Sequence, residues 1–368
     1  MKIKTITCHE VYNHGASLQT YALQTYLESL GHDVEIIDYK PPYLSKHYDL
    51  WLVGNPFYYK YIILRIIYVL LKLPNRLISL KRKRSFDVFA KKYLKISTHR
   101  YKSNEELKAN CPEGDVFIAG SDQIWNCLFP NGRDPAFYLD FVPKEKVRAS
   151  YAASFAGSTL DKEYHNMVKE RVSFLNYVSV RESSGLEILK QIGINNAKQV
   201  LDPVFLLDKT YWNALATEYY NDEYLFVYDF EGSEQIKKIC LKIAKEHKLK
   251  IFSINCTSSY IDKKFSYSGP ETFLSLIKYS KYVVSNSFHG TAFALIFEKE
   301  FVVVERSEGI NARMIDLLKN LNIQERLITT YQPLQAINYS QVNIQIDNLV
   351  QKSKKYLNSV LTKREISK

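Results

Sequence analysis

The sequence predicts an α/β protein that contains two parallel-sheet domains. Its 368 residues exceed what one hydrophobic core usually organises, and 46% hydrophobic with 24% charged residues is an ordinary globular composition. Strand-like and helix-like segments alternate in two series, one before and one after residue 202. Because a strand–helix–strand unit joins parallel neighbours through a right-handed crossover, each series is expected to build its own parallel sheet.

The first series begins with a strand, a helix and a second strand. Residues 3–8 and 34–39 are short apolar runs, and the segment 17–30 between them carries apolar side chains on one helical face. This order places Asn13 and Gly15 at the carboxyl end of the first strand, the edge at which parallel sheets bind ligands. The loop lacks the Gly-x-Gly-x-x-Gly pattern, so a dinucleotide site has weak support.

A polar loop, Gly120–Asn126, follows the strand expected at 115–119. Within it, Asp122 and Gln123 stand next to Trp125, a combination that suits the binding of a sugar. The alternative is a turn in which Asp122 accepts hydrogen bonds from neighbouring backbone amides.

Arg181 follows a short strand expected at 177–180. This strand comes after a longer one at 147–155 and a helix at 162–174. A guanidinium at the carboxyl end of a strand forms a fork for phosphate or carboxylate. The ordinary alternative is an ion pair with Glu182 or another nearby acid.

Residues 57–102 carry the excess positive charge of the chain, whose net charge is +11. They contain 13 Lys or Arg and one acidic residue, whereas the rest of the chain has 37 Lys or Arg against 38 Asp or Glu. The first part, 57–73, is apolar, but it is too short and too interrupted by Lys60, Arg65 and Lys72 to span a membrane. A dense basic run follows it.

This basic segment has two structural interpretations. An apolar helix joined to a basic run is typical of a segment that lies in an anionic membrane surface. A core helix followed by a solvated charged helix requires the same periodicity, so both interpretations stay open. Nucleic acid is not expected as a partner, because no recognisable nucleic-acid-binding motif accompanies the basic residues.

Asp202-Pro203 is expected to turn the chain into the second series. There we expect strands at 224–228, 250–254, 282–284 and 301–304 and helices at 233–247, 291–297 and 311–321. The loop Ser285–Gly290 precedes the helix that starts at Thr291. A helix N-terminus directs N–H groups and partial positive charge at a ligand, and a histidine such as His289 exchanges protons near neutral pH. The alternative role for His289 is to cap the helix or fill a polar corner.

The expected domain boundaries are 1–204, 205–330 and a helical tail, 331–368, that packs back on the first domain. Five cysteines without a Cys-x-x-Cys pair indicate reduced thiols, a cytoplasmic protein and no structural zinc. His9 and Glu10 are neighbours, but no further residue completes a ligand set, so no metal is expected.

Six motifs that occur in one order along most of the chain resemble the polysaccharide pyruvyl transferase family. They are Asn13-x-Gly-Ala-x-Leu-Gln-x-x-Ala-Leu23, Gly120-Ser-Asp-Gln-Ile-Trp-Asn126, Ser150-Tyr-Ala-Ala-Ser154, Val180-Arg-Glu182, Leu201-Asp-Pro203 and Ser285-x-Ser-Phe-His-Gly-Thr291. Residues 57–102 stand outside the resemblance as a variable segment. The resemblance implies two Rossmann-like domains that face each other across a cleft, similar to the GT-B glycosyltransferase fold.

The resemblance also implies a reaction. Its donor is phosphoenolpyruvate, without a further cofactor, and its acceptor is a pair of sugar hydroxyls, so that a cyclic pyruvate ketal and phosphate form. The family's catalytic His falls on His289 and its donor-binding Arg on Arg181. Better-studied members carry Arg where this chain has Ser287, and Arg313 is our candidate for the missing cation. The expected residues are His289, Arg181, Ser287, Gly290, Thr291 and Arg313 for catalysis and the donor, and Asn13, Gly15, Asp122, Gln123 and Trp125 for the acceptor, on the side of the first domain.

The expected acceptor is a lipid-linked precursor of a surface polysaccharide, an exopolysaccharide or capsule, at the cytoplasmic face of the membrane. Residues 57–102 would reach it by docking on the anionic surface. Two other functions stay open. A glycosyltransferase with a nucleotide-sugar donor would use a helix N-terminus and a cleft equally well. A non-catalytic member of a polysaccharide assembly complex is favoured by Ser287 alone.

Overall fold

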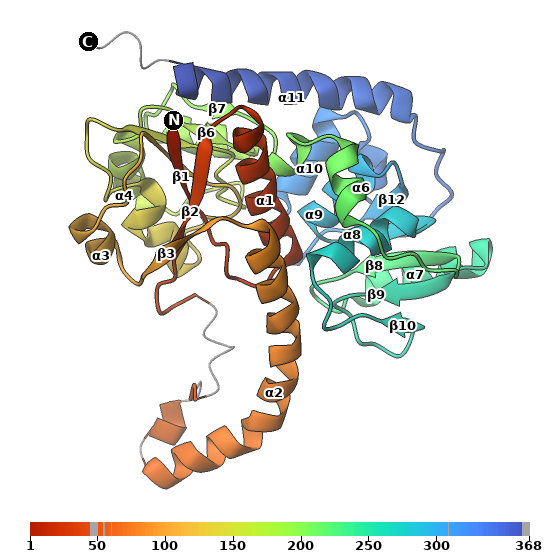
Figure 1. Cartoon of the computed structure of the whole chain (residues 1–368). Coiled ribbons are helices and arrows are strands. Elements are labelled where there is room, and N and C mark those ends of the chain that lie inside the picture. Colours follow the sequence, from red (N-terminus) through yellow and green to blue (C-terminus); the bar gives the residue numbers. More distant parts are fainter. Residues whose placement is uncertain (45–50, 54–55, 60, 308, 363–368) are drawn as a thin grey trace.

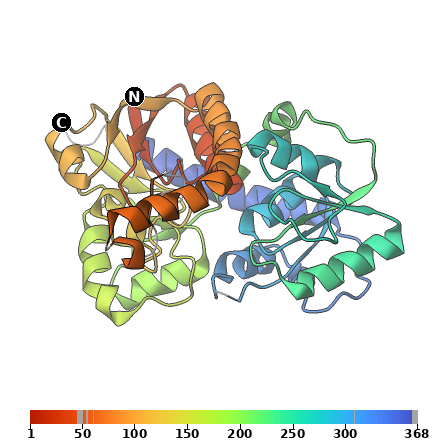
Figure 2. The ribbon, with the colours of Figure 1, turned by 90° about the horizontal axis from the view of Figure 1, so that it is seen from below.

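The computed structural model describes residues 1–44, 51–53, 56–59, 61–307 and 309–362. Lys60 of the basic segment and residues 363–368 of the expected tail lie outside the described residues. The chain forms two α/β halves that lie side by side (Figure 1; Figure 2).

Each half contains a five-stranded parallel sheet with the same order of strands. The order is β3-β2-β1-β4-β5 in the first half and β10-β9-β8-β11-β12 in the second. Each chain segment therefore starts at the centre of its sheet, moves to one edge and returns past the centre, as in Rossmann-like domains. The expected fold class is confirmed. The strands are β1 (Lys2–Ile6), β2 (Asp33–Tyr39), β3 (Ile96–Tyr101), β4 (Val116–Ala119), β5 (Val147–Ser150), β8 (Tyr224–Tyr228), β9 (Lys250–Ser253), β10 (Lys263–Lys264), β11 (Tyr282–Ser285) and β12 (Glu300–Val303).

Helices cover the sheets, and α1, α8 and α9 meet where the two halves touch. A further small sheet in the first half pairs β6 (Ser179–Val180) with β7 (Lys198–Gln199). The helices are α1 (His14–Ser29), α2 (Ile62–Tyr93), α3 (Asn104–Ala109), α4 (Lys162–Ser173), α5 (Ser183–Gln191), α6 (Lys209–Leu215), α7 (Glu234–His247), α8 (Pro270–Tyr279), α9 (Phe288–Ile296), α10 (Ala312–Asn320) and α11 (Tyr339–Thr362), with short 3₁₀ turns that include η5 (Pro203–Phe205).

Several expected elements have different ends in the structure. Helix α1 starts three residues earlier than expected because the Asn13 side chain accepts a hydrogen bond from the Ala16 amide at 3.2 Å and caps the helix. The strand expected at 147–155 ends at Ser150, because Ala152 takes a left-handed φ of 49° that interrupts an extended strand. Strand β3 and helices α3, α5 and α6 have no counterpart among the expected elements.

One hydrophobic core crosses the boundary and joins the two halves. It includes Leu18 of α1, Trp212 of α6, Phe293 of α9 and Leu357 of α11, which are all buried. The Trp212 and Phe293 rings meet edge to face with centroids 4.9 Å apart. Because apolar side chains of both halves fill the same core, the halves stabilise each other.

Helix α11 lies across both halves on one side of the molecule (Figure 1). Near its start, the Asn343 side chain donates to Glu298 of the second half at 2.9 Å. Near its end, the Tyr356 hydroxyl donates to the Ser150 carbonyl at 2.8 Å, and Ser353 Oγ accepts from the Leu201 amide at 2.9 Å. The tail therefore touches the second half as well as the first.

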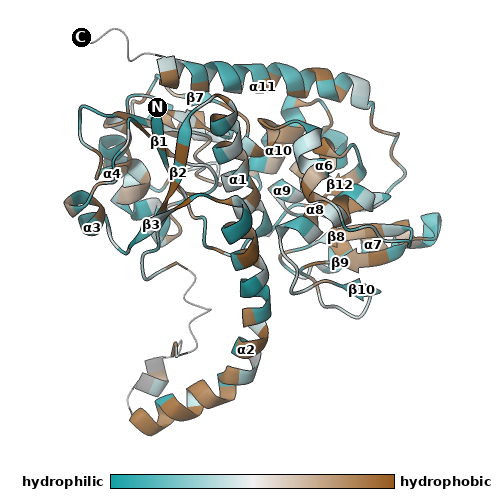
Figure 3. Cartoon of the chain, in the orientation of Figure 1, coloured by the Kyte–Doolittle hydropathy of each residue, from teal (hydrophilic) through white to brown (hydrophobic). Residues whose placement is uncertain are grey.

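Helix α2 is the most unusual element. It continues through Pro74 for 32 residues, and its first half projects from the body, with mainly apolar side chains on its surface (Figure 1; Figure 3). Eight Ile and Leu side chains between Ile62 and Ile78 are 43–72% exposed. The interpretation of 57–73 as a core helix is therefore wrong, because these apolar side chains face away from any core. Among the described residues, no helix is long and apolar enough to cross a membrane.

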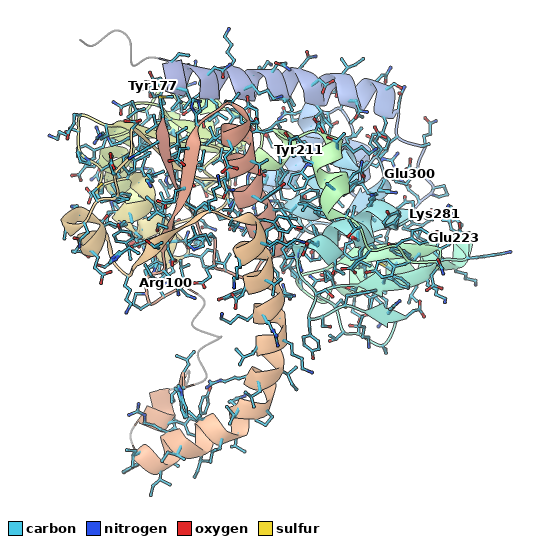
Figure 4. The ribbon with its side chains drawn as sticks, in the orientation of Figure 1. Arg100, Tyr177, Tyr211, Glu223, Lys281 and Glu300 are labelled. Atoms are coloured by element: carbon cyan, nitrogen blue, oxygen red, sulfur yellow. The ribbon has the colours of Figure 1, made fainter. Side chains whose placement is uncertain are left out.

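The second part of the basic segment packs on the body. Phe86 and Phe89 of α2 are buried, and Lys92 forms an ion pair with Glu271 of α8 at 3.1 Å. Arg100 of β3 donates to Asp38 of β2 at 2.8 Å (Figure 4). These partners bind part of the positive charge of the segment to the protein itself.

Candidate active site

The loops that follow β1, β4, β11 and β12 meet at a small polar cavity of about 60 Å³ between the halves. These loops all leave the carboxyl ends of parallel strands, the edge at which such sheets bind ligands. The cavity lies between the halves, where the sequence predicts a site. Its lining comprises Asn13, Asp122 and Gln123 from the first half and Phe230, Asn286, Ser287, Phe288, His289, Arg306, Ile310, Arg313 and Met314 from the second.

Ser287 sets the start of α9 beside this cavity. Its backbone is extended, its Oγ accepts from the Gly290 amide at 3.5 Å, and its own amide donates to Ser285 Oγ at 3.0 Å. The helix consequently starts at Phe288, three residues before the expected Thr291. His289 therefore lies in the first helical turn, where the amide groups and the partial positive charge of the helix face the cavity.

His289 is enclosed by residues of the first half. Its Nε2 lies 3.6 Å from Oδ2 of Asp202, which is fully buried at the start of η5. On the other side of the ring, a Cβ added to Gly15 would lie 2.0 Å from His289 Nδ1, so only glycine fits at this position of α1. The motif around residue 202, interpreted from sequence as a turn, thus supplies a carboxylate to the histidine of the other half.

Two carboxylates and two guanidiniums connect the halves behind the cavity. Arg181 donates to Asp202 and, at 3.1 Å, to Asp122. Arg313 of α10 donates to the same Asp122 oxygen at 3.3 Å. Asp122 from the loop after β4 therefore holds one cation of each half, which a turn-capping role alone would not achieve.

Burial and charge pairing act against each other in this network. Burial raises the pKa of the Asp122 carboxyl, but Arg181, His289 and Arg313 outweigh it and hold that pKa below its usual range. The pKa of Asp202 is also lowered, because His289 and Arg181 outweigh the cost of burial. Burial and the neighbouring Arg181 lower the pKa of Arg313 to about 10, which leaves Arg313 protonated at neutral pH.

Arg181 does not present its guanidinium to the cavity. Its side chain is 2% exposed, is absent from the cavity lining and binds Asp122 and Asp202. The expected direct contact between Arg181 and a donor is therefore not found, and the alternative of an ion pair with nearby acids holds. The sequence pattern located the strand end correctly but could not show that two acids from other loops occupy the fork.

Arg306 is a cavity residue that the sequence reasoning missed. It follows β12, lies 3.7 Å from Glu231 through Nε, and its guanidinium stands 5.3 Å from the centre of the Phe230 ring. The strand before it was expected at 301–304. The same rule that singled out Arg181, a cation just beyond a strand's carboxyl end, would have found Arg306.

Trp125 does not form a sugar-binding surface. Its side chain is fully buried, stacks on Tyr138 with ring centroids 5.3 Å apart, and donates its indole N–H to the Phe137 carbonyl at 3.1 Å. Both faces and the polar edge of the ring are therefore used inside the first half. The prediction failed because hydrogen-bonding neighbours in sequence do not show on which side of a loop a ring packs.

Of the remaining expected residues, some line the cavity and others stabilise helix α9. Asn13, Gln123, Ser287 and Arg313 reach the cavity with His289 and Asp122. Gly290 and Thr291 support α9 instead: a Cβ at Gly290 would lie 2.4 Å from Ser285 Oγ, and Thr291 Oγ1 donates to the Ser287 carbonyl at 3.0 Å. Within the described residues, no group of three or more His, Cys, Asp or Glu could hold a metal ion.

A second cavity of about 170 Å³ adjoins the first and shares the side chain of Ile310 with it. It lies mainly on the first half and is lined by polar groups around the ring of Tyr164, among them Asn126, Ser158, Thr159 and Asp161.

Several solved structures resemble the whole chain at low identity. The UDP-GlcNAc 2-epimerase of Methanocaldococcus jannaschii is 15% identical, with a TM-score of 0.47 over 98% of this chain and 99% of that one. The UDP-GlcNAc 2-epimerase of Neisseria meningitidis bound to UDP-GlcNAc is 11% identical, with a TM-score of 0.48 over 98% and 94%. The E. coli heptosyltransferase WaaC with ADP is 12% identical, with a TM-score of 0.39 over 95% and 100%. These likenesses are too distant to bear on substrate.

No curated protein matches the chain in sequence. The model of one protein family, described as polysaccharide pyruvyl transferase, matches residues 13–308. This match covers most of the chain, every strand of the two five-stranded sheets except β1, and the cavity lining apart from Ile310, Arg313 and Met314. The chain therefore belongs to the polysaccharide pyruvyl transferase family and is a transferase of polysaccharide biosynthesis.

Proposed function

We propose that the protein transfers pyruvate from phosphoenolpyruvate to two hydroxyls of a sugar in a surface-polysaccharide precursor, forming a cyclic ketal and releasing phosphate. The observation that carries this proposal is the convergence of His289, Arg306 and Arg313 on one cavity between the halves. No further cofactor is part of the proposal.

The donor carries a carboxylate and a phosphate, and the cavity offers matching groups. Arg306 and Arg313 stand on the lining, and the first turn of α9 adds backbone amides and partial positive charge. Ser287 occupies the position at which better-studied members of the family carry Arg. Arg306, which reaches the same cavity from the loop after β12, is proposed to supply that charge together with Arg313.

The reaction needs two proton movements. One sugar hydroxyl adds to C2 of the donor while its methylene carbon gains a proton and becomes a methyl group. The second hydroxyl then replaces phosphate at C2, and its proton leaves with the phosphate. We assign these transfers to His289, which as a positioned acid and base would contribute roughly 10²–10⁴-fold to the rate.

Asp202 determines which nitrogen of His289 is available. The carboxylate lies 3.6 Å from Nε2 and stays ionised, so it favours a proton on Nε2. Nδ1, on the side of Gly15, is then the nitrogen that exchanges a proton with the substrate. Asp202 and Gly15 both belong to the first half, so this arrangement exists only while the halves are together.

The acceptor sugar is proposed to bind from the first half. Asn13, Asp122 and Gln123 place hydrogen-bonding groups on the donor cavity, and the adjoining cavity around Tyr164 offers a ring and several polar side chains. We further propose that the sugar is attached to a lipid carrier and that the reaction takes place at the cytoplasmic face of a membrane. A free nucleotide sugar is not needed in this scheme.

Thermal stability with a ligand panel tests the donor. Phosphoenolpyruvate present well above its Kd should raise the melting temperature, because it binds only the folded protein. Arg306→Ala should abolish the rise, whereas Arg148→Ala, at the start of β5 and outside the cavity, should retain it. A rise with a nucleotide sugar alone would contradict the proposal and indicate a glycosyltransferase.

Turnover tests the role of His289. His289→Asn should lower kcat by roughly 10²–10⁴-fold while the shift caused by phosphoenolpyruvate persists, because the variant loses the proton carrier and keeps both arginines. Near-normal turnover of this variant would exclude His289 as the acid and base.

A further inference from the structure

The projecting half of α2 exposes an apolar surface that the protein does not cover. Its eight Ile and Leu side chains between Ile62 and Ile78 are 43–72% exposed, and Trp51, Phe57 and Tyr61 beside them are 76%, 70% and 57% exposed. An apolar surface of this kind marks a site of interaction with a partner or a membrane. Aromatic side chains at its end suit the boundary between lipid head groups and acyl chains.

The projecting part of α2, residues 62–78, together with Trp51, Phe57 and Tyr61, is called the arm below. Its net charge indicates which kind of partner binds it. Between residues 57 and 86 the sequence contains eight Lys or Arg and no Asp or Glu. Asp87, the first acid, already forms an ion pair with Lys83 at 2.6 Å. A second copy of the arm would bring like charges together, whereas an anionic lipid surface would neutralise them.

The arm is anchored rigidly at the side of the active site. Arg82 donates to the carbonyl of Tyr12, in the loop after β1, at 3.2 Å, and Ser85 donates to the carbonyl of Tyr267 in the second half at 2.6 Å. The arm extends from there beyond the carboxyl ends of the first sheet, away from α11 (Figure 1; Figure 2). A surface bound to the arm would therefore lie on the side at which the cavity loops stand.

We propose that residues 62–78 of α2, with Trp51, Phe57 and Tyr61, insert into the surface of an anionic phospholipid bilayer. The apolar side chains enter the head-group boundary, and basic side chains such as Lys72 and Lys81 contact lipid phosphates. The basic run near residue 92 is not part of this surface, because its partners are on the protein. The inference gives the proposed lipid-linked acceptor a location, but docking itself requires neither donor nor turnover.

Vesicle flotation of the full chain tests the docking. The protein should float with phosphatidylcholine vesicles that contain phosphatidylglycerol and stay below pure phosphatidylcholine vesicles. Ile63→Glu with Leu71→Glu should reduce the binding by at least about tenfold, since each places a charge in the apolar boundary. Ile344→Glu, at a side chain of α11 that is 63% exposed, is the matched control and should bind normally.

Charge reversal tests the electrostatic part. Lys72→Glu should weaken binding by roughly thirtyfold, because a basic residue near an anionic membrane contributes on the order of 1 kcal/mol and a reversal counts twice. Lys245→Glu on α7, far from the arm, should leave binding unchanged. All these positions are exposed, so melting temperatures should match the wild type and exclude unfolding as the cause.

Trp51 supplies a local signal of insertion. The other two tryptophans, Trp125 and Trp212, are fully buried, so a blue shift of the emission on addition of anionic vesicles would come from Trp51, and Trp51→Phe should remove it. Absence of flotation, or flotation unchanged by the arm substitutions, would overturn the proposal. So would a lipid-free dimer that Ile63→Glu with Leu71→Glu converts to a monomer, because a second copy would then cover the arm.

Discussion

Asp202 lies beside His289 across the boundary of the two halves, and this contact between two single residues determines the chemistry proposed for the histidine. Neither residue could be paired with the other from sequence. Asp202 stands before a proline, a position typical of turns, and its carboxylate indeed accepts from the Val204 amide at 3.1 Å. The other carboxylate oxygen reaches Arg181 and His289, which the fold brings from elsewhere.

Asp202→Asn should lower kcat by roughly 10²-fold, because the neutral amide no longer favours the proton on Nε2. The KM for the donor should change less, since Asp202 does not line the cavity.

Asp122→Asn is the control for this substitution. It also removes a carboxylate from Arg181, but it leaves the one beside His289, so it should destabilise the protein while kcat falls less than in Asp202→Asn. An unchanged kcat for Asp202→Asn would show that Asp202 only stabilises the fold.

Gly15→Ala should inactivate the enzyme although the substitution is small. Its Cβ would lie 2.0 Å from His289 Nδ1 and 2.2 Å from Cγ, so the imidazole must leave its present position beside Asp202. A misplacement on the order of 1 Å costs about 10²-fold in rate. Gly157→Ala, whose Cβ would meet nothing nearer than 3.6 Å, should keep its fold and the thermal shift caused by phosphoenolpyruvate. Full activity of Gly15→Ala would mean that His289 tolerates displacement.

The sequence predicted part of this site. Asn13, Asp122, Gln123, Ser287 and His289 all reach one cavity, because each follows the carboxyl end of a strand whose apolar pattern is clear. Trp125 and Arg181 share that position and are nevertheless buried. Burial depends on partners from distant segments, and a local pattern contains no information about them.

Helices and strands are specified mainly by short-range interactions. The sequence predicted most of them but placed several of their ends incorrectly. Helix α9 starts early because Ser287 caps it, a signal present in the sequence but assigned to the loop. The opposite error occurred after β5, where nothing in the pattern 147–155 announces the left-handed φ of Ala152. The long α2 continues through Pro74, a residue that ordinarily ends or kinks a helix.

Ser287→Ala should separate the capping of α9 from the binding of the donor. Loss of the cap should cost about 1 kcal/mol of stability, measured as a lower urea midpoint. Ser233→Ala removes an equivalent cap from α7, where Ser233 Oγ accepts from the Ile236 amide at 3.3 Å, and should cost a similar amount. Only Ser287→Ala should also raise the KM for phosphoenolpyruvate, since only Ser287 lines the cavity. Equal KM values for the two variants would remove Ser287 from the donor site.

The whole molecule folds around a core that both halves share. The two parallel sheets could be predicted because strand–helix alternation is strong in both parts of the chain. The shared core could not, since it depends on how α1, α6, α9 and α11 meet. We therefore expect a single thermal transition for both halves, measured by calorimetry.

Leu357→Ala tests the shared core from the far end of the chain. Leu357 is fully buried in α11, and its truncation should cost about 2–5 kcal/mol. The single transition should move to lower temperature as a whole, whereas Ile344→Ala on the exposed part of α11 should leave it within about 0.5 kcal/mol. Two separate transitions would show that the halves unfold independently.

The path of the chain determines how the halves can move. The chain passes from the first half to the second around residues 201–208 and returns along α11, and these two connections line one cavity at the back of the molecule. These two adjacent chain connections form a hinge that permits the halves to rotate about one axis and resists twisting of one half against the other. A rotation about this axis would separate His289 of the second half from Gly15 and Asp202 of the first half. In the proposed reaction, such a rotation would release the ketal product, and its reversal would bring His289 back to Asp202.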